Sequence, residues 1–268
     1  MIAVFFGLFG LIVGSFLNVV ILRFGERSVG GRSSCPHCGT QLRALDMVPV
    51  LSWIFLRGRC RYCKVRISIQ YPLVEAATAT FFAAIGASAL TVAQLVLALP
   101  IAALLICIFT YDLKHKLIPD IWVWIFIALA LLYGFLNSQF VILNSILSGP
   151  VAALPILFLW YLSRPFTGRA GQWMGFGDVK LALGLGWLLG FPLGFVSIFL
   201  AFIIGAVISV CILLPLPHIL HFCGIRTKEG SIGLTMKSEV PFGPFLIAAG
   251  AIAWFMIMYN IQIPLLIL

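Results

Sequence analysis

Residues 92–112 read VAQLVLALPIAALLICIFTYD, an apolar run whose only charged side chain is the closing Asp112. A helix that spans a bilayer needs about 20 consecutive, mostly apolar residues. The composition agrees, since 62% of the 268 residues are hydrophobic and only 9% are charged. Soluble domains carry about 25% charged residues. These values exclude a water-soluble enzyme, a disordered chain and a disulfide-stapled chain.

Seven further segments have the same apolar character as 92–112. They are 2–22, 72–90, 118–137, 140–162, 177–190, 192–215 and 241–263. We therefore expect an all-α polytopic membrane protein with about eight transmembrane helices. Segment 177–190 is short and rich in glycine, which suits close helix packing and permits a tilt or a break. The first segment lacks a basic start and is too long for the apolar core of a cleaved signal peptide.

The basic residues favour one orientation of these helices. If all eight segments span, the loops 23–71, 113–117, 163–176 and 216–240 share one side. All 17 Lys and Arg residues belong to that side or, like Lys180, to its boundary. The positive-inside rule makes that side cytoplasmic and puts both termini outside. The net charge of +9 therefore indicates orientation in a membrane rather than nucleic-acid binding.

The hydrophilic segment 23–71 contains two Cys-x-x-Cys pairs, Cys35-Pro36-His37-Cys38 and Cys60-Arg61-Tyr62-Cys63. Four thiolates at this spacing suit one tetrahedral Zn²⁺, and Gly39 suits a tight turn after the first pair. Disulfides are the alternative, which a reducing cytoplasm disfavours. Four thiolates leave no open coordination position, so we expect a structural zinc rather than a catalytic one. The expected ligands are Cys35, Cys38, Cys60 and Cys63.

This segment is also strongly basic, with nine Lys and Arg residues against Glu26 and Asp46, a net of +7. Such a loop is attracted to anionic headgroups. We predict three parts of the chain: a first transmembrane helix (1–22), a cytoplasmic zinc-binding domain (23–71) and a seven-helix membrane domain (72–268). The isolated Cys107, Cys211 and Cys223 are expected to be small buried hydrophobic residues.

Four of the eight carboxylates lie in or beside apolar segments, where an ionised side chain is costly and functional by default. They are Glu75, Asp112, Asp120 and Asp178. Asp112 closes one segment and Asp178 opens another, so this topology puts both at one depth on the cytoplasmic side. Two carboxyl groups that share a proton can supply a base that activates water and an acid that protonates a leaving amine. Peptide hydrolysis is one chemistry that such a pair supports.

An acid at a helix end has a simpler explanation as a cap or an ion-pair partner. Asp120 directly follows Pro119, and both proline and an acid are favourable at a helix N-terminus. Glu75, one turn after Pro72, fits the same explanation. Asp178 also lies near a helix start, so its local sequence does not separate it from Asp120.

Short motifs follow one another along nearly the whole chain. They are Gly14–Val20 (GSFLNVV), the two Cys pairs, Pro49–Trp53 (PVLSW), Arg57–Cys60 (RGRC), Tyr71–Glu75 (YPLVE), Asp112 with Ile118-Pro119-Asp120, Gly175–Lys180 (GFGDVK) and Val240–Phe245 (VPFGPF). In this order they resemble the prepilin peptidases, or type IV leader peptidases. That family comprises polytopic aspartic proteases of the bacterial inner membrane with a Gly-x-Gly-Asp signature.

The resemblance implies that Asp112 and Asp178 are the catalytic pair. It implies a prepilin or pseudopilin substrate, cut on the cytoplasmic side after a glycine that ends a short basic leader. It also implies a second activity, typical of members with the four-Cys loop: N-methylation of the new N-terminal residue with S-adenosylmethionine. The residues give no site for this methyl donor, since no glycine-rich nucleotide motif is present. Glu75 is our candidate for it.

Two hypotheses from other classes remain open at this point. A proton-coupled transporter would use the same intramembrane acids as a relay but would not account for the Cys pairs. A non-catalytic assembly subunit would use the membrane helices only to anchor its zinc module. The expected partners are the lipid bilayer and pilin precursors, with no nucleic acid, and the sequence does not determine the oligomeric state.

Overall fold

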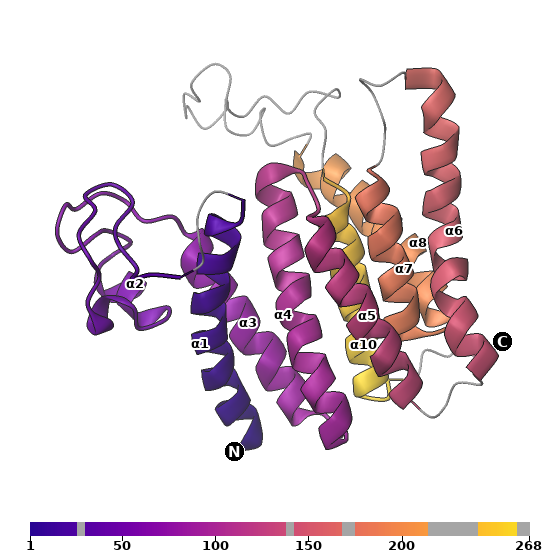
Figure 1. The fold of residues 1–268 in the computed structure, drawn as a ribbon, viewed down its shortest axis with the longest axis horizontal. Helices are drawn as coiled ribbons and strands as arrows, with labels where there is room; N and C mark the ends of the chain where they lie inside the picture. The colour runs from indigo at the N-terminus through magenta and orange to yellow at the C-terminus, as the bar shows by residue number, and fades with distance from the viewer. Residues whose placement is uncertain (26–29, 138–141, 168–174, 214–240, 262–268) are drawn as a thin grey trace. The chain divides into compact units, whose positions relative to one another are not determined.

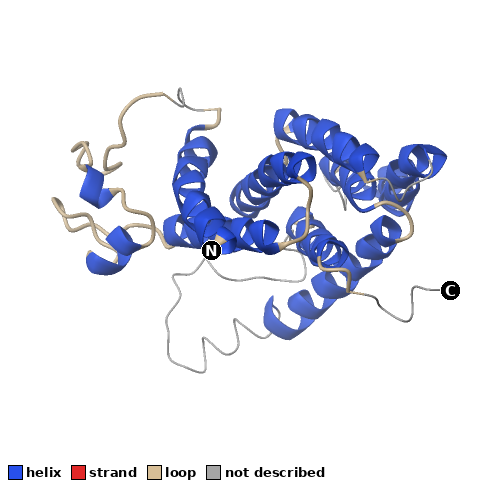
Figure 2. Cartoon of the chain, turned by 90° about the horizontal axis from the view of Figure 1, so that it is seen from below, coloured by secondary structure: helices blue, strands red, loops and turns tan. Residues whose placement is uncertain are grey.

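The computed structural model describes residues 1–25, 30–137, 142–167, 175–213 and 241–261 (Figure 1). Its long elements are helices α1 (Ile2–Arg23), α3 (Gln70–Ala87), α4 (Val92–His115), α5 (Asp120–Leu136), α6 (Ile142–Thr167), α7 (Phe176–Leu189), α8 (Leu193–Ile208) and α10 (Gly243–Met258). A π-helical turn, η3 (Ser209–Leu213), extends α8. Each of the eight apolar segments forms a helix, so the predicted all-helical membrane fold is confirmed (Figure 2).

Within the described residues, four helical stretches are long and apolar enough to cross a bilayer. They are Ile2–Arg23, Val92–His115, Ile146–Ser163 and Leu193–Cys211. Helices α5 and α10 are apolar but shorter. The loop between α1 and α3 adds two short elements that the apolar pattern does not indicate, η1 (Ala44–Asp46) and α2 (Leu51–Phe55).

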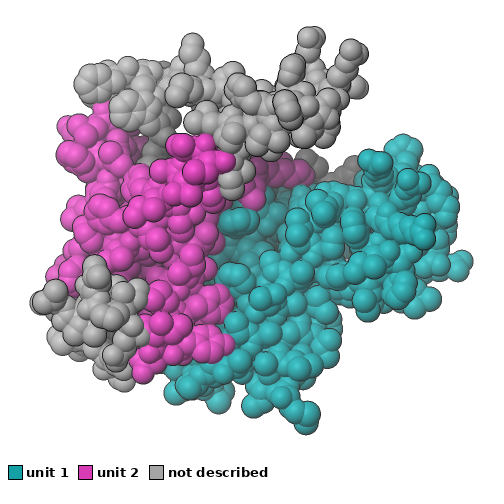
Figure 3. Space-filling model, turned by 180° about the vertical axis from the view of Figure 1, so that it is seen from behind, with its two compact units in different colours: residues 1–111 teal, residues 112–268 magenta. Residues whose placement is uncertain are grey.

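The chain divides into two compact units, residues 1–111 and 112–268, shown in teal and magenta in Figure 3. In the first unit, α1 and α3 pack closely along an antiparallel interface, because Gly14 lies against Glu75 and Gly10 against Ala79. An added Cβ at either glycine would lie less than 3 Å from the α3 backbone. Gly10 and Gly14 are four residues apart, the spacing that allows close approach of membrane helices.

The second unit is organised around α7, which packs against α5, α6, α8 and α10. Its glycines allow this: a side chain at Gly184 would overlap the Phe126 ring of α5, and one at Gly186 would lie 2.6 Å from the Cβ of Ala152 on α6. Segment 177–190 is therefore a continuous buried helix, and its glycines serve close packing rather than a break. An edge-to-face pair of buried rings, Tyr133 and Trp254, joins α5 to α10.

Several predicted details differ from the structure. Asp112 does not end its helix, because α4 continues to His115. Cys107 is buried as expected, but Cys211 is exposed, so the prediction of a buried residue was wrong there. The apolar surroundings of Cys211 in the sequence do not reveal which face of α8 and its π-helical turn it occupies. Loop 216–240, Glu26 and Cys223 lie outside the described residues.

Candidate active site and metal site

Asp112 lies in the last turn of α4, and its side chain is buried, with an exposed fraction of 4%. The N–H of Lys116 donates to the Asp112 carbonyl over 2.8 Å. Lys116 then takes a positive φ of 52°, which ends the helix. Asp112 is therefore held on the final rigid turn of a long apolar helix, next to a short polar connection to α5.

Asp178 lies in the first turn of α7, and its exposed fraction is 7%. Gly175 is the N-cap residue in an extended conformation, and its carbonyl accepts the Asp178 N–H over 3.2 Å. An acid in a first helical turn is stabilised by the partial positive charge of the helix N-terminus. Burial distinguishes this acid from Asp120, whose side chain is 66% exposed.

The second unit brings the two carboxyl groups together, close enough for the charge on Asp112 to act on Asp178. Ile118, in the connection after α4, packs beside them. A Cβ at Gly177 would lie 3.0 Å from the Ile118 Cβ, and one at Gly243 would lie 3.2 Å from the Ile118 Cδ1. The Gly243 position would also overlap the Asp112 Oδ2. Two glycines thus make room for Ile118 and for the Asp112 carboxylate.

Gly243 is a site residue whose role the sequence did not reveal. It belongs to the motif Val240–Phe245, but nothing in that motif indicates contact with Asp112. It is the first residue of α10, and Pro244 follows it, a position where proline is favourable because its missing N–H has no helical partner. The start of α10 therefore lies against the Asp112 carboxylate.

Asp120 pairs with Lys180 instead of joining the two buried acids. The Lys180 Nζ lies 2.6 Å from the Asp120 Oδ1 and stands 5.6 Å from the ring centre of Trp124 and 5.3 Å from that of Phe176. The ammonium group thus contacts two aromatic faces as well as a carboxylate. This ion pair links the N-terminal turns of α5 and α7, and it supports the simpler explanation of Asp120.

The buried pair has the chemistry of an acid–base couple. Two carboxyl groups that sense each other's charge favour a state in which one is ionised and the other keeps the proton. The ionised member can accept a proton from water and the other can donate one. Both side chains are buried, so their carboxyl groups are largely shielded from solvent.

The four cysteines of the loop come together as predicted. Their sulfur atoms all lie within 4.8 Å of one another and could hold a metal ion. Cys35 and Cys60 are buried, and Cys38 is exposed. The predicted ligand set Cys35, Cys38, Cys60 and Cys63 is therefore geometrically coherent.

Each Cys pair forms a tight turn of the same design. In the first, the Cys35 N–H donates to the Thr40 carbonyl and Gly39 has φ +69°; in the second, the Cys60 N–H donates to the Val65 carbonyl and Lys64 has φ +58°. The sequence indicated the first turn through Gly39. It gave no sign of the second, because lysine rarely takes a positive φ.

Hydrogen bonds in the first Cys turn favour a thiolate at Cys38. The Thr40 hydroxyl lies 3.3 Å from the Cys38 Sγ. Hydrogen bonds from the Thr40 side chain and backbone lower the pKa of the Cys38 thiol to about 6, and the thiolate is the form that binds metals. Asp46, which the sequence left without a role, accepts a hydrogen bond from Arg61 Nε over 2.6 Å and so ties η1 to the second turn.

Glu75 belongs to the first unit, whereas the two aspartates belong to the second. It is buried, with an exposed fraction of 7%, on the face of α3 that packs against α1. Its Oε2 accepts the N–H of Val50 over 2.7 Å, and the side chain of Ser15 donates a second hydrogen bond. The carboxylate thus already has two protein partners.

Two ranges of the chain match known protein families. Residues 8–89 match the Bacterial Peptidase A24 N-terminal domain, and residues 97–210 match the Type IV leader peptidase family. The second range contains both Asp112 and Asp178. No solved structure matches the chain.

Three curated relatives share the same name, "Prepilin leader peptidase/N-methyltransferase". The protein from Dichelobacter nodosus is 33% identical over 97% of this chain and 92% of its own length. Those from Pseudomonas putida and Aeromonas hydrophila are 34% and 33% identical, over 91% and 92% of this chain and 87% and 88% of their own lengths. With both ranges matched and such relatives spanning nearly its full length, the chain belongs to the type IV leader peptidase family.

Proposed function

We propose that this protein is a membrane aspartic endopeptidase that removes the basic leader from type IV prepilins or pseudopilins. The observation that carries the proposal is the burial of Asp112 and Asp178 at two helix ends, where the charge of Asp112 acts on Asp178. The family match and the names of the relatives support the substrate class. The transporter hypothesis has no support from these comparisons, and it does not account for the cysteine cluster.

In the proposed reaction, the ionised member of the Asp112–Asp178 pair takes a proton from a water molecule, which attacks the carbonyl carbon of the scissile peptide bond. The protonated member then donates its proton to the leaving amine. Water attacks directly, so no acyl-enzyme forms. Burial at helix ends limits competing solvent, while the short connection after α4 leaves the pair near the membrane boundary.

The direct test is an assay of the purified full chain on a precursor peptide with a basic leader, with and without S-adenosylmethionine. Cleavage without the methyl donor, followed by mass gain of the mature product only with it, would support both proposed activities. Absence of cleavage in a folded, zinc-loaded preparation would contradict the peptidase proposal.

The metal of the cysteine cluster is proposed to be one structural Zn²⁺ within the domain 23–71. A tetrahedral site with Zn–S bonds of about 2.3 Å places its sulfurs about 3.8 Å apart, and the Cys35 and Cys63 sulfurs are 3.8 Å apart. With four thiolates the shell is closed, so the ion supplies cross-linking rather than a site for water. We also propose that residues 1–22 form the first transmembrane helix and that residues 72–268 form the seven-helix membrane domain.

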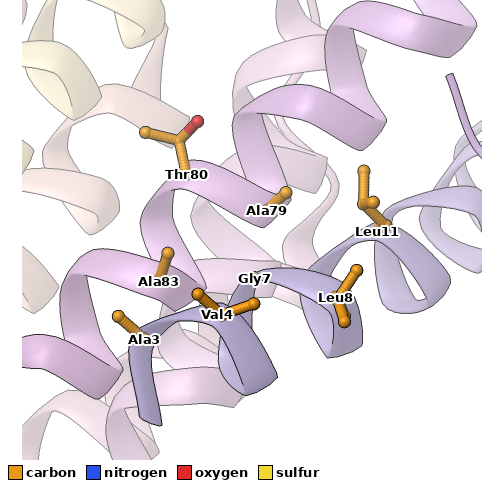
Figure 4. Close-up of a pocket in the computed structure, with 8 residues that line it drawn as sticks. All are labelled: Ala3, Val4, Gly7, Leu8, Leu11, Ala79, Thr80 and Ala83. Carbon is orange, nitrogen blue, oxygen red and sulfur yellow. The ribbon is translucent and has the colours of Figure 1, made fainter. Parts of the chain in front are cut away.

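N-methylation is proposed from the names of the relatives. S-adenosylmethionine would supply an activated methyl group. A groove on the first unit, between α1 and α3, does not fit this donor: it is lined by Ala3, Val4, Gly7, Leu8, Leu11, Ala79, Thr80 and Ala83, which are almost entirely apolar (Figure 4). We therefore assign no residues to the methyl donor.

The protein is proposed to lie in the bacterial inner membrane with its active site on the cytoplasmic side. Val92 and Leu117 offer a test, because both are exposed and they lie at the start of α4 and just beyond its end. In a zinc-loaded background with Cys211→Ser and Cys223→Ser, we expect Leu117→Cys to react with a membrane-impermeant thiol reagent only in inverted vesicles. Val92→Cys is expected to react only in right-side-out vesicles, and the reverse pattern would overturn the topology.

Gly243→Ala is expected to reduce cleavage strongly, because the added methyl group would overlap the Asp112 carboxylate. Displacing a reacting group by about 1 Å can cost roughly 10²-fold in rate. The measurement is kcat on a precursor peptide. Gly7→Ala is the matched control, since its added Cβ would meet Ala83 at an ordinary 3.4 Å. Equal kcat values for the two variants would show that Gly243 does not shape the site.

A further inference from the structure

The loop that carries the cysteines is attached to the membrane helices at a third point besides its two ends. Val50 lies between the two Cys turns, just before α2. Its N–H donates to the Glu75 Oε2 over 2.7 Å. Glu75 is on α3, so this hydrogen bond joins the middle of the loop to the helix pair α1–α3.

The helix pair is shaped around this contact. Gly14 lets α1 approach α3 at the level of Glu75, where an added Cβ would lie 2.7 Å from the Glu75 Cα. The next residue of α1, Ser15, donates to the same carboxylate. One turn further, the buried Asn18 donates from its Nδ2 to the Tyr71 carbonyl over 3.1 Å. Two side chains of α1 thus hold the first turns of α3.

Val50 itself needs an external contact to keep its conformation. Its φ is +59°, which a β-branched residue adopts only when the surrounding structure holds it there. The hydrogen bond to Glu75 is such a restraint.

We propose that Glu75 is a positioning residue that fastens the metal-binding loop to α1 and α3. It acts through hydrogen-bond acceptance and not as a charge that contacts the methyl donor or the substrate. Its consequence for activity rests on the proposed methylation, which we expect to need an ordered loop. A Glu75→Gln variant separates hydrogen-bond acceptance from negative charge. Glutamine has no charge but retains one side-chain oxygen that can accept the Val50 N–H.

The test compares Glu75→Ala, Glu75→Gln and Ser15→Ala in the full-length, zinc-loaded protein, with Thr80→Ala as a control on an exposed face of the same helix. Hydrogen exchange of the amides of residues 47–56 reports attachment of the loop. Leaving the Val50 N–H without its acceptor should speed that exchange roughly tenfold in Glu75→Ala. Ser15→Ala should show a smaller increase, and Glu75→Gln and Thr80→Ala should stay within about threefold of the unsubstituted protein.

Methylation of a cleaved peptide is the second measurement, and zinc content is the third. We expect Glu75→Ala to lose methylation in parallel with loop protection while it keeps its metal, and Glu75→Gln to retain methylation. Unchanged exchange in Glu75→Ala would overturn the proposal. Loss of methylation in Glu75→Gln with normal loop protection would also overturn it, because the carboxylate would then have a chemical role. If the unsubstituted protein does not methylate, the methyltransferase proposal fails and exchange alone decides the role of Glu75.

Discussion

Replacing either Asp112 or Asp178 by asparagine is expected to abolish leader cleavage while the protein still inserts and folds. Asparagine matches aspartate in size, so the buried space around each side chain stays filled. It cannot accept or donate a proton at neutral pH, however, and loss of general acid–base catalysis costs roughly 10²–10⁴-fold in rate. The measurement is single-turnover cleavage of a precursor peptide by purified variants, with thermal unfolding as the check on the fold.

Asp120→Asn is the matched control, since Asp120 is in the same motif as Asp112 but is largely exposed. Its ion pair with Lys180 is expected to contribute about 0.2–1 kcal/mol, as exposed pairs usually do, so cleavage should fall by less than roughly fivefold. An inactive Asp120 variant beside an active Asp112 variant would reverse the assignment within this motif. Equal, small losses in all three variants would exclude an aspartic mechanism.

The helices could be predicted from the sequence because each is a long apolar run, and burial in lipid leaves a helix as the main way to satisfy its backbone. The predicted ends of the helices were less accurate. Helix α4 continues past Asp112 through Lys114 and His115, whose positive or polar side chains are favourable at a helix C-terminus. Apolarity alone places the end of the run at Asp112, whereas the helix ends only where Lys116 takes a positive φ.

The two aspartates were singled out for a different reason. The predicted topology puts their helix ends at one depth, and the motifs around them resemble a known family. The contacts that shape the pair were not predictable, because they come from distant segments. Gly243 lies against Asp112 only through the packing of α10, and periodicity along α10 does not indicate its neighbour.

In the loop, too, local sequence patterns indicate the metal ligands but not the contacts with distant segments. Four cysteines at metal-ligand spacing identify the cluster, since few other functions need that spacing. The hydrogen bond from the Val50 N–H to Glu75 depends on the positive φ of Val50, a conformation that β-branched residues rarely adopt. The residue type at this position therefore argues against the contact. The cost of a buried carboxylate singled out Glu75 correctly as unusual, but its partners lie in the loop and on α1.

Removing one cysteine ligand is expected to reduce both the zinc content and the protease resistance of the loop strongly. Cys60→Ser should lower the zinc content from one per chain to nearly none and make the loop sensitive to protease. The loop is too short to bury a core of its own, and structural zinc supplies about 10–16 kcal/mol of apparent binding free energy in zinc-finger peptides. Metal analysis and limited proteolysis of the purified protein measure both effects.

Cys211→Ser controls for the loss of a thiol, because Cys211 is exposed and belongs to the other unit, outside the cluster. It should keep one zinc and an intact loop. Because four thiolates would leave a bound zinc no open coordination position, cleavage by Cys60→Ser should fall only in step with loop proteolysis. Two outcomes would contradict this account: full zinc content in Cys60→Ser would exclude the cysteine cluster as the metal site, and loss of cleavage with a protected loop would give the metal a direct part in the reaction.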